Sequence, residues 1–161
     1  MIRIKQIKTN LQDAGLDAAR HMAAVKLAYR ASAELALKEF KATTRTWKHQ
    51  PDFTATGGSD GISQIVGTDD RIYGYVDEGT RPHLIRPRGR FLRFASGYRA
   101  KTSPNTIGSR SGGAFGSTVY ARAVRHPGTK PRNFTRIIGR DIQAALLRRV
   151  QQAIAREAAK G

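Results

Sequence analysis

The feature that most constrains the fold is an apolar stripe with helical spacing near the start of the chain. From Leu11 to Phe40, apolar residues recur every three or four positions, and no proline interrupts the segment. This period places the apolar side chains on one face of an α-helix. Asn10 is the expected N-cap, with Asp13 close to the positive end of the helix dipole. The pattern therefore predicts a helix over residues 10–44.

A helix of this length carries more apolar surface than a small sheet covers. About 35 residues at roughly 1.5 Å per residue reach on the order of 50 Å, whereas a typical strand has only about five residues. Either the helix bends or its outer part packs on another subunit. Val25 and Tyr29 lie in the middle of the stripe, and we expect them at such a subunit interface.

A second helical stripe occupies the C-terminal part of the chain. Phe134, Ile138 and Ile142 begin a series of apolar residues that continues to Ile154, with arginines on the opposite side. Asn133 precedes the series and is the expected N-cap. The pattern predicts a helix over residues 133–159.

The segment between the two helices has the apolar patterns and turn residues of β-strands. Residues 62–66 and 71–76 predict a hairpin, and residues 91–94 and 118–124 predict further strands. The sequence thus predicts an α+β fold. An antiparallel sheet of about four strands, within residues 45–125, is packed by the long N-terminal helix and the C-terminal helix. With 161 residues, the chain is expected to form a single domain, 1–161.

Residues 96–117 separate two of these strands. They contain five Gly residues together with Ser, Asn, Pro and three basic residues. This composition orders poorly in isolation. It predicts a long, mobile loop that projects from the sheet edge and becomes ordered against a partner.

The charge of the chain is unusual. Its 29 Lys and Arg residues outnumber 12 Asp and Glu residues, which gives a formal net charge of +17. From Gly79 to Arg140 the chain has 14 Lys or Arg residues and no acidic residue. Such an excess favours contact with a polyanion, either nucleic acid or an acidic protein surface.

The absence of cysteine excludes disulfides and thiolate metal sites. The N-terminus lacks the continuous apolar region of a signal peptide, and no run approaches the ~20 apolar residues of a membrane span. We therefore expect a soluble protein, made in a cytosol and without contact to a membrane.

Two similar turn sequences bracket the basic segment. The first contains Gly-Thr-Arg-Pro-His and the second His-Pro-Gly-Thr-Lys-Pro. In each, Gly suits a positive φ and Pro restrains the adjoining backbone, which together favour a sharp turn. The turn residues are Gly79, Thr80, Pro82, His83, His126, Pro127, Gly128 and Thr129.

The two histidines of these turns, with Asp77 and Glu78 near the first, are the only candidates for a metal site or an acid–base pair. His83 and His126 lack the short spacing of a dedicated metal site, and histidine beside proline in a turn is more often a packing residue. The sequence also has no nucleophile motif and no phosphate-binding loop. It therefore predicts no enzyme activity, no catalytic or metal-binding residue and no cofactor.

The two turn sequences, in this order and spacing, resemble those of the tail-completion or neck proteins that join head to tail in long-tailed bacteriophages. The resemblance covers roughly residues 47–150. It implies a structural virion protein without catalysis or cofactor, located in the tail or neck and in the host cytoplasm during assembly. The implied partners are copies of itself in a ring, a hexamer by analogy with tail symmetry. Further partners are neighbouring head-completion and tail-terminator or tail-tube proteins, and phage double-stranded DNA in the lumen.

The alternative is a free, basic nucleic-acid-binding module that acts through phosphate contacts. Phe91 and Phe94 are interleaved with the arginines, but the alternation favours both rings in the core. No helix-turn-helix, zinc-finger or RNA-recognition signature accompanies the basic run. In either case the candidate contacts to DNA or to an acidic partner are Arg81, Arg86, Arg88, Arg90, Arg99, Lys101 and Arg110.

Overall fold

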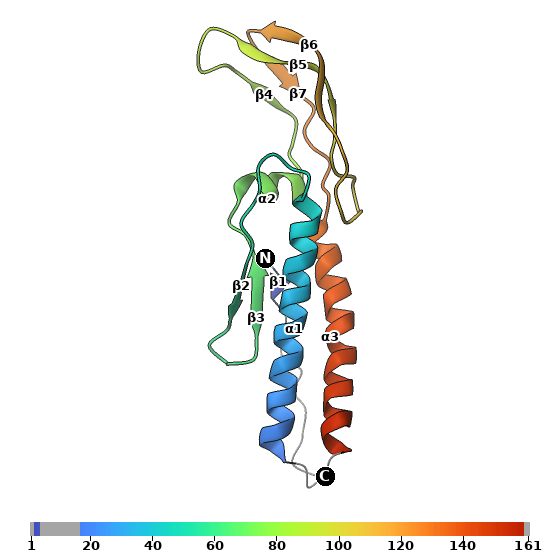
Figure 1. Cartoon of the computed structure of the whole chain (residues 1–161). Helices are drawn as coiled ribbons and strands as arrows, with labels where there is room; N and C mark the ends of the chain where they lie inside the picture. Colours follow the sequence, from blue (N-terminus) through green and yellow to red (C-terminus); the bar gives the residue numbers. More distant parts are fainter. Residues whose placement is uncertain (1, 4–16, 160–161) are drawn as a thin grey trace. The chain divides into compact units, whose positions relative to one another are not determined.

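The computed structural model describes residues 2–3 and 17–159, and its fold is α+β, with helices and small antiparallel sheets (Figure 1). The chain divides into two compact units, and the single domain expected over 1–161 stays a prediction. Unit 1 comprises Met1–Lys41, Asp52–Thr68 and Thr135–Gly161, and unit 2 comprises Ala42–Pro51 and Asp69–Phe134. The elements, in order, are β1 (Ile2–Arg3), α1 (Ala18–Thr44), β2 (Thr54–Gly57), β3 (Gln64–Gly67), α2 (Arg71–Asp77), β4 (His83–Ile85), β5 (Leu92–Arg99), β6 (Gly113–Ala121), β7 (Val124–His126) and α3 (Phe134–Ala158).

The two long helices predicted from the sequence are present. In unit 1 they lie side by side (Figure 1), and an ion pair joins Arg20 of α1 to Glu157 of α3 at 3.5 Å. The apolar stripe of each helix is buried, as the helical spacing required. On α1 the buried residues include Tyr29, Ala33, Ala36 and Phe40, and on α3 they include Ile138, Ile142, Leu146 and Val150.

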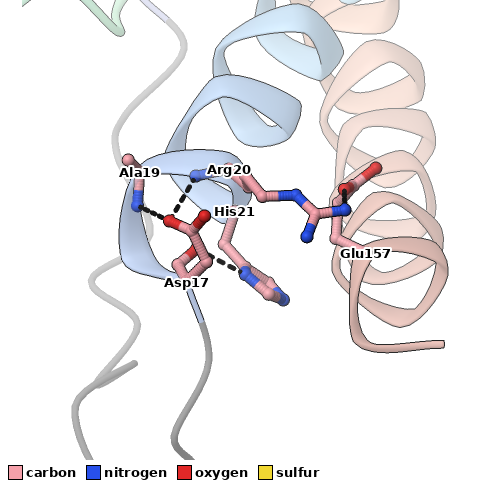
Figure 2. A network of polar contacts seen from close by, with 5 residues as sticks. All are labelled: Asp17, Ala19, Arg20, His21 and Glu157. Carbon is pink, nitrogen blue, oxygen red and sulfur yellow. Dashed lines mark hydrogen bonds and ion pairs between the residues drawn. The ribbon is translucent and has the colours of Figure 1, made fainter. Parts of the chain in front are cut away.

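The N-terminal end of α1 is held by Asp17. Its carboxylate Oδ1 accepts hydrogen bonds from the backbone N–H groups of Ala19 and Arg20, at 3.0 and 3.2 Å (Figure 2). Its backbone oxygen accepts from Nδ1 of the buried His21 at 2.9 Å. A capping carboxylate in the first turn satisfies N–H groups that have no partner within the helix. The start expected at Asn10 lies outside the described residues.

A small antiparallel sheet completes unit 1, with strand order β1-β3-β2. Val66 of β3 is fully buried and pairs with both Ile2 and Ala55. Phe53, just before β2, stacks on Phe40 of α1 with ring centroids 5.2 Å apart. These contacts cover part of the apolar stripe of α1 with the sheet, as the sequence suggested.

Two paired strand sets and one short helix build unit 2. Strands β4 and β7 pair antiparallel, and the longer β5 and β6 form a hairpin with an irregularity between Ala95 and Gly97. Tyr73 of α2 packs between Trp47 and Phe134, with ring centroids 6.2 and 6.1 Å away. This aromatic group gives the unit a small core.

The division of the strands corrects the prediction of one sheet with about four strands. Within residues 2–3 and 17–159, the strands form one three-stranded and two two-stranded sheets. Residues 71–76, predicted as a strand, belong to helix α2, because Asp70 caps it by accepting a hydrogen bond from the Tyr73 N–H at 2.7 Å. The predicted partner strand instead becomes β3, which pairs with β2 and β1.

The segment predicted as a loop over residues 96–117 is also shorter than expected. Its two ends extend β5 and β6, so the connection is confined to residues 100–112. This connection makes hydrogen bonds to other segments of unit 2. Lys101 Nζ donates to the Thr46 oxygen at 2.5 Å, Thr46 Oγ1 donates to the Arg110 oxygen at 3.0 Å, and the Asn105 N–H donates to the Arg132 oxygen at 3.0 Å.

Three side-chain predictions need correction. Tyr29 is 1% exposed and Val25 is also buried, so both belong to the core of unit 1 and are not free for a subunit interface. Phe91 and Phe94, predicted in the core, are 43% and 40% exposed, because the two-stranded hairpin has no second layer over both faces. Asn133 precedes α3 as expected, but its φ is 60° and its Nδ2 donates to Asn105.

Candidate functional site

The two turn sequences form one structural element in unit 2. The N–H of Thr80 donates to the Thr129 oxygen at 3.0 Å, and the N–H of Thr129 donates back to the Thr80 oxygen at 3.1 Å. Thr80 Oγ1 also accepts from the Thr129 N–H at 2.9 Å. The same register continues into β4 and β7, where His83 lies opposite His126. Two segments 49 residues apart thus make a single paired turn.

Glycine is required at both turns for two physical reasons. Gly79 and Gly128 have φ values of +78° and +87°, which residues with a Cβ adopt only with strain. A Cβ at Gly79 would also lie 2.5 Å from the backbone oxygen of Thr129, and one at Gly128 would meet the backbone oxygen of Thr80. The close approach of the two turns therefore depends on both glycines, as the sequence predicted for the positive φ.

The paired histidines pack against each other within this element. Their ring centroids are 5.0 Å apart. His83 Nδ1 donates to the Arg81 oxygen at 2.9 Å, and His126 Nδ1 accepts from the Gly128 N–H at 3.1 Å. Residues 2–3 and 17–159 contain no group of three or more metal-ligating side chains. The local hydrogen bonds fit the packing role that the sequence favoured.

Positive charge is concentrated in unit 2. The unit has 15 Lys and Arg residues and 4 Asp and Glu residues, so its formal net charge is +11 of the +17 of the chain. All four acidic residues lie in the stretch from Asp69 to Glu78. The predicted contacts Arg81, Arg86, Arg88, Arg90, Arg99 and Arg110 are exposed, whereas Lys101 is half-buried in the connection after β5.

The β5–β6 hairpin carries exposed aromatic residues as well as arginines. Arg90 lies over the ring of Phe91, 5.3 Å from its centroid. Arg93 pairs with Tyr120 across the hairpin, and cross-strand partners point to the same face. The sequence indicated Phe91 and Phe94 but not Tyr98, Phe115 or Tyr120, which are 69%, 58% and 65% exposed. The glycine-rich and serine-rich composition around Tyr98 and Phe115 concealed the strands there, whereas Tyr120 lies in a predicted strand.

The other face of the hairpin is apolar. Leu92 pairs with Ala121, and Phe94 pairs with Val119. Because side chains alternate along a strand, these four lie on the face opposite Arg93 and Tyr120. A two-stranded hairpin is marginally stable alone in water, and Phe94 remains 40% exposed in the described part of the chain. This face is therefore suited to protein contact.

A histidine–carboxylate pair lies near α2. His49 Nε2 and Asp70 Oδ2 are 2.5 Å apart. The hydrogen bond from His49 lowers the pKa of Asp70 below its ordinary value, and the bond from the Tyr73 N–H lowers it further. Asp70 is thus a carboxylate that caps α2 and holds residues 42–51 to it. The pair has a clear structural role.

Comparisons with known protein families, with characterised proteins and with solved structures find no match. In the described residues, no helix is long and apolar enough to cross a membrane.

Proposed function

We propose that this chain is a structural protein of the tail-completion or neck type, which assembles as a ring at the head–tail junction of a long-tailed bacteriophage. The observation that carries the proposal is the pairing of the two Gly-Thr turns. The residues on which the resemblance depends are brought together by reciprocal Thr80–Thr129 hydrogen bonds and by the His83–His126 pair. In this proposal the two turns act as one element, which explains why both contain Gly, Thr, His and Pro.

The β5–β6 hairpin supplies the contact that a ring needs. Its apolar face, with Leu92, Phe94, Val119 and Ala121, packs against a neighbouring subunit in this proposal. The exposed arginines then face acidic surfaces of neighbouring neck or tail proteins, or the DNA that passes through the lumen. Burial of an exposed aromatic residue on assembly contributes roughly 1.5–3 kcal/mol per side chain.

The test is the mass of the purified full chain in light scattering, with two matched variants. Phe94→Gln alters the apolar face, whereas Tyr120→Gln alters an exposed aromatic residue on the opposite face of the same hairpin. We expect a ring-sized species for the unmodified chain and for Tyr120→Gln, and dissociation for Phe94→Gln. A monomer at all concentrations, or equal behaviour of both variants, contradicts the proposal.

The second candidate is a nucleic-acid-binding module that acts as a monomer. The specific observation in its favour is the arrangement of Arg90 over Phe91 and of Arg93 beside Tyr120, since arginines and exposed rings together suit nucleic acid. A monomer that binds duplex DNA tightly, with an affinity that falls steeply with salt, favours this function. A ring with weak duplex binding favours the neck protein.

A further inference from the structure

A cavity of about 470 Å³ opens in unit 2, and Thr129 of the paired turns is among the residues that line it. Its volume falls in the range of roughly 300–1,000 Å³ that is usual for small-molecule sites. Residues 47–49, helix α2, the hairpin ends and the segment before α3 all contribute to it. The side chains that decide its chemistry are Trp47, Lys48, Ile72, Tyr98, Lys101 and Arg132.

The cavity is positively charged. Lys48, Lys101 and Arg132 line it, and no Asp or Glu is among the described residues of its wall. Nε of Arg132 is buried and has no hydrogen-bond partner in the part of the chain that the structure describes. The pKa of Arg132 lies below its ordinary value, mainly because of burial; Tyr98 raises this pKa and Arg110 lowers it. An anion in the cavity would supply the negative partner that this cluster lacks.

Two aromatic rings also line the cavity, and one of them is firmly positioned. Trp47 packs on Tyr73, which packs on Phe134, so its ring is held by the core of unit 2. Tyr98 is on β5, opposite Ala114, and is 69% exposed. The small Ala114 leaves the Tyr98 ring accessible beside the cavity. Ring faces of this kind stack on unpaired bases.

We propose that this cavity binds one unpaired base of a single-stranded nucleic acid, with Trp47 and Tyr98 contacting the base and Lys48, Lys101 and Arg132 contacting its phosphates. The combination of rings and cations selects this ligand. A duplex keeps its bases stacked inside, so it presents phosphates alone to the cavity. An acidic peptide satisfies the cations but leaves the ring faces without a stacking partner. The proposal does not depend on the formation of a ring.

The only tryptophan of the chain lines the cavity, which makes its fluorescence a direct probe. We expect an eight-residue thymidine oligonucleotide, (dT)8, to quench Trp47 in the full chain and to protect it from acrylamide. A blunt duplex of equal length and inorganic polyphosphate should do so much less. Loss of one stacking partner should weaken (dT)8 binding roughly 5- to 150-fold, because stacking contributes about 1–3 kcal/mol per base.

Matched variants separate the cavity from the rest of the basic surface. Tyr98→Ala should weaken (dT)8 binding, whereas Tyr75→Ala, which removes a 55% exposed ring of α2 outside the cavity wall, should change it less than about threefold. Lys48→Gln should likewise weaken binding more than Lys130→Gln, which removes the same charge elsewhere in unit 2. Circular dichroism checks that each variant is folded. Protection of Trp47 from acrylamide by (dT)8 is measured on the unmodified chain, so this test of the cavity does not depend on the folding of any variant.

Three results would overturn the proposal. These are equal quenching by duplex or polyphosphate, quenching by polyglutamate without quenching by (dT)8, and equal effects of Tyr98→Ala and Tyr75→Ala. The neck function is tested separately, by the mass of the assembly in light scattering. If the protein forms a ring but does not bind (dT)8, the cavity site is wrong and the neck function stands. If the protein is a monomer that binds (dT)8 through Tyr98, the neck function is wrong and the cavity site stands.

Discussion

Gly79→Ala should lower the free energy of unfolding of unit 2, and the size of this loss can be worked out from the geometry of the paired turns. A residue with a Cβ at φ +78° costs roughly 1–2 kcal/mol. The new Cβ would also lie 2.5 Å from the Thr129 oxygen and 2.9 Å from the Pro131 nitrogen. These are backbone atoms, so the turns must separate, which weakens the two backbone hydrogen bonds between Thr80 and Thr129, at about 1 kcal/mol each. The expected total loss is about 2–4 kcal/mol.

The chain offers a matched control for this substitution. Gly108, in the connection between β5 and β6, also has a positive φ of +100°, but a Cβ there would meet nothing within 4 Å. Gly108→Ala should therefore cost only the conformational part, about 1–2 kcal/mol. The difference between the two variants isolates the close approach of the turns.

The assay is urea unfolding followed by the fluorescence of Trp47. Because Trp47 lies in unit 2 and is the only tryptophan, its signal reports on this unit and not on unit 1. Gly79→Ala should lower the midpoint more than Gly108→Ala without changing the slope. Equal midpoints for the two variants, or no effect of Gly79→Ala, would refute the account of the paired turns.

Three further predictions concern other parts of the chain. Tyr29→Ala removes a ring that is 1% exposed and should lower the free energy of unfolding by about 3–5 kcal/mol, measured by unfolding followed with circular dichroism. Leu27→Ala, at a 64% exposed position, should change this free energy by less than about 0.5 kcal/mol. Asp70→Asn should destabilise unit 2 at neutral pH. Since the pKa of folded Asp70 lies below its ordinary value of 3.8, this stabilisation is present above that value and is lost as the pH falls through the folded pKa, so variant and unmodified chain should converge in acid unfolding curves. Lys101→Met removes the bond to the Thr46 oxygen and should speed tryptic cleavage at Arg110 several-fold, and an unchanged rate relative to Lys130→Met would contradict this role.

The long helices could be predicted from the sequence because their signal is local. Apolar residues at helical spacing, such as Tyr29, Ala33 and Phe40, must share one face of a helix and become buried together. The positive φ of Gly79 and Gly128 was predictable for the same reason, since it follows from residue type within a turn. Helix α2 also had a local signal, because Asp70 stands three residues before the Tyr73 N–H that it caps. The alternation of Ile72 and Gly74 with aromatic residues outweighed it.

What sequence reasoning could not supply depends on contacts between distant residues. The connection after β5 is fixed by Thr46, 55 residues before Lys101, and no local pattern shows this. The pairing of Thr80 with Thr129 is equally distant, although the similar turn sequences were visible. The exposure of Phe94 and Tyr98 follows from the division of the strands into separate two-stranded sets. Periodicity alone does not distinguish a covered face from an uncovered one.

The most direct test of the proposed function is negative-stain electron microscopy of the purified full chain. We expect closed rings with an axial opening, which Phe94→Gln abolishes and Tyr120→Gln preserves. Particles of monomer size in every preparation, or open filaments in place of closed rings, would contradict it.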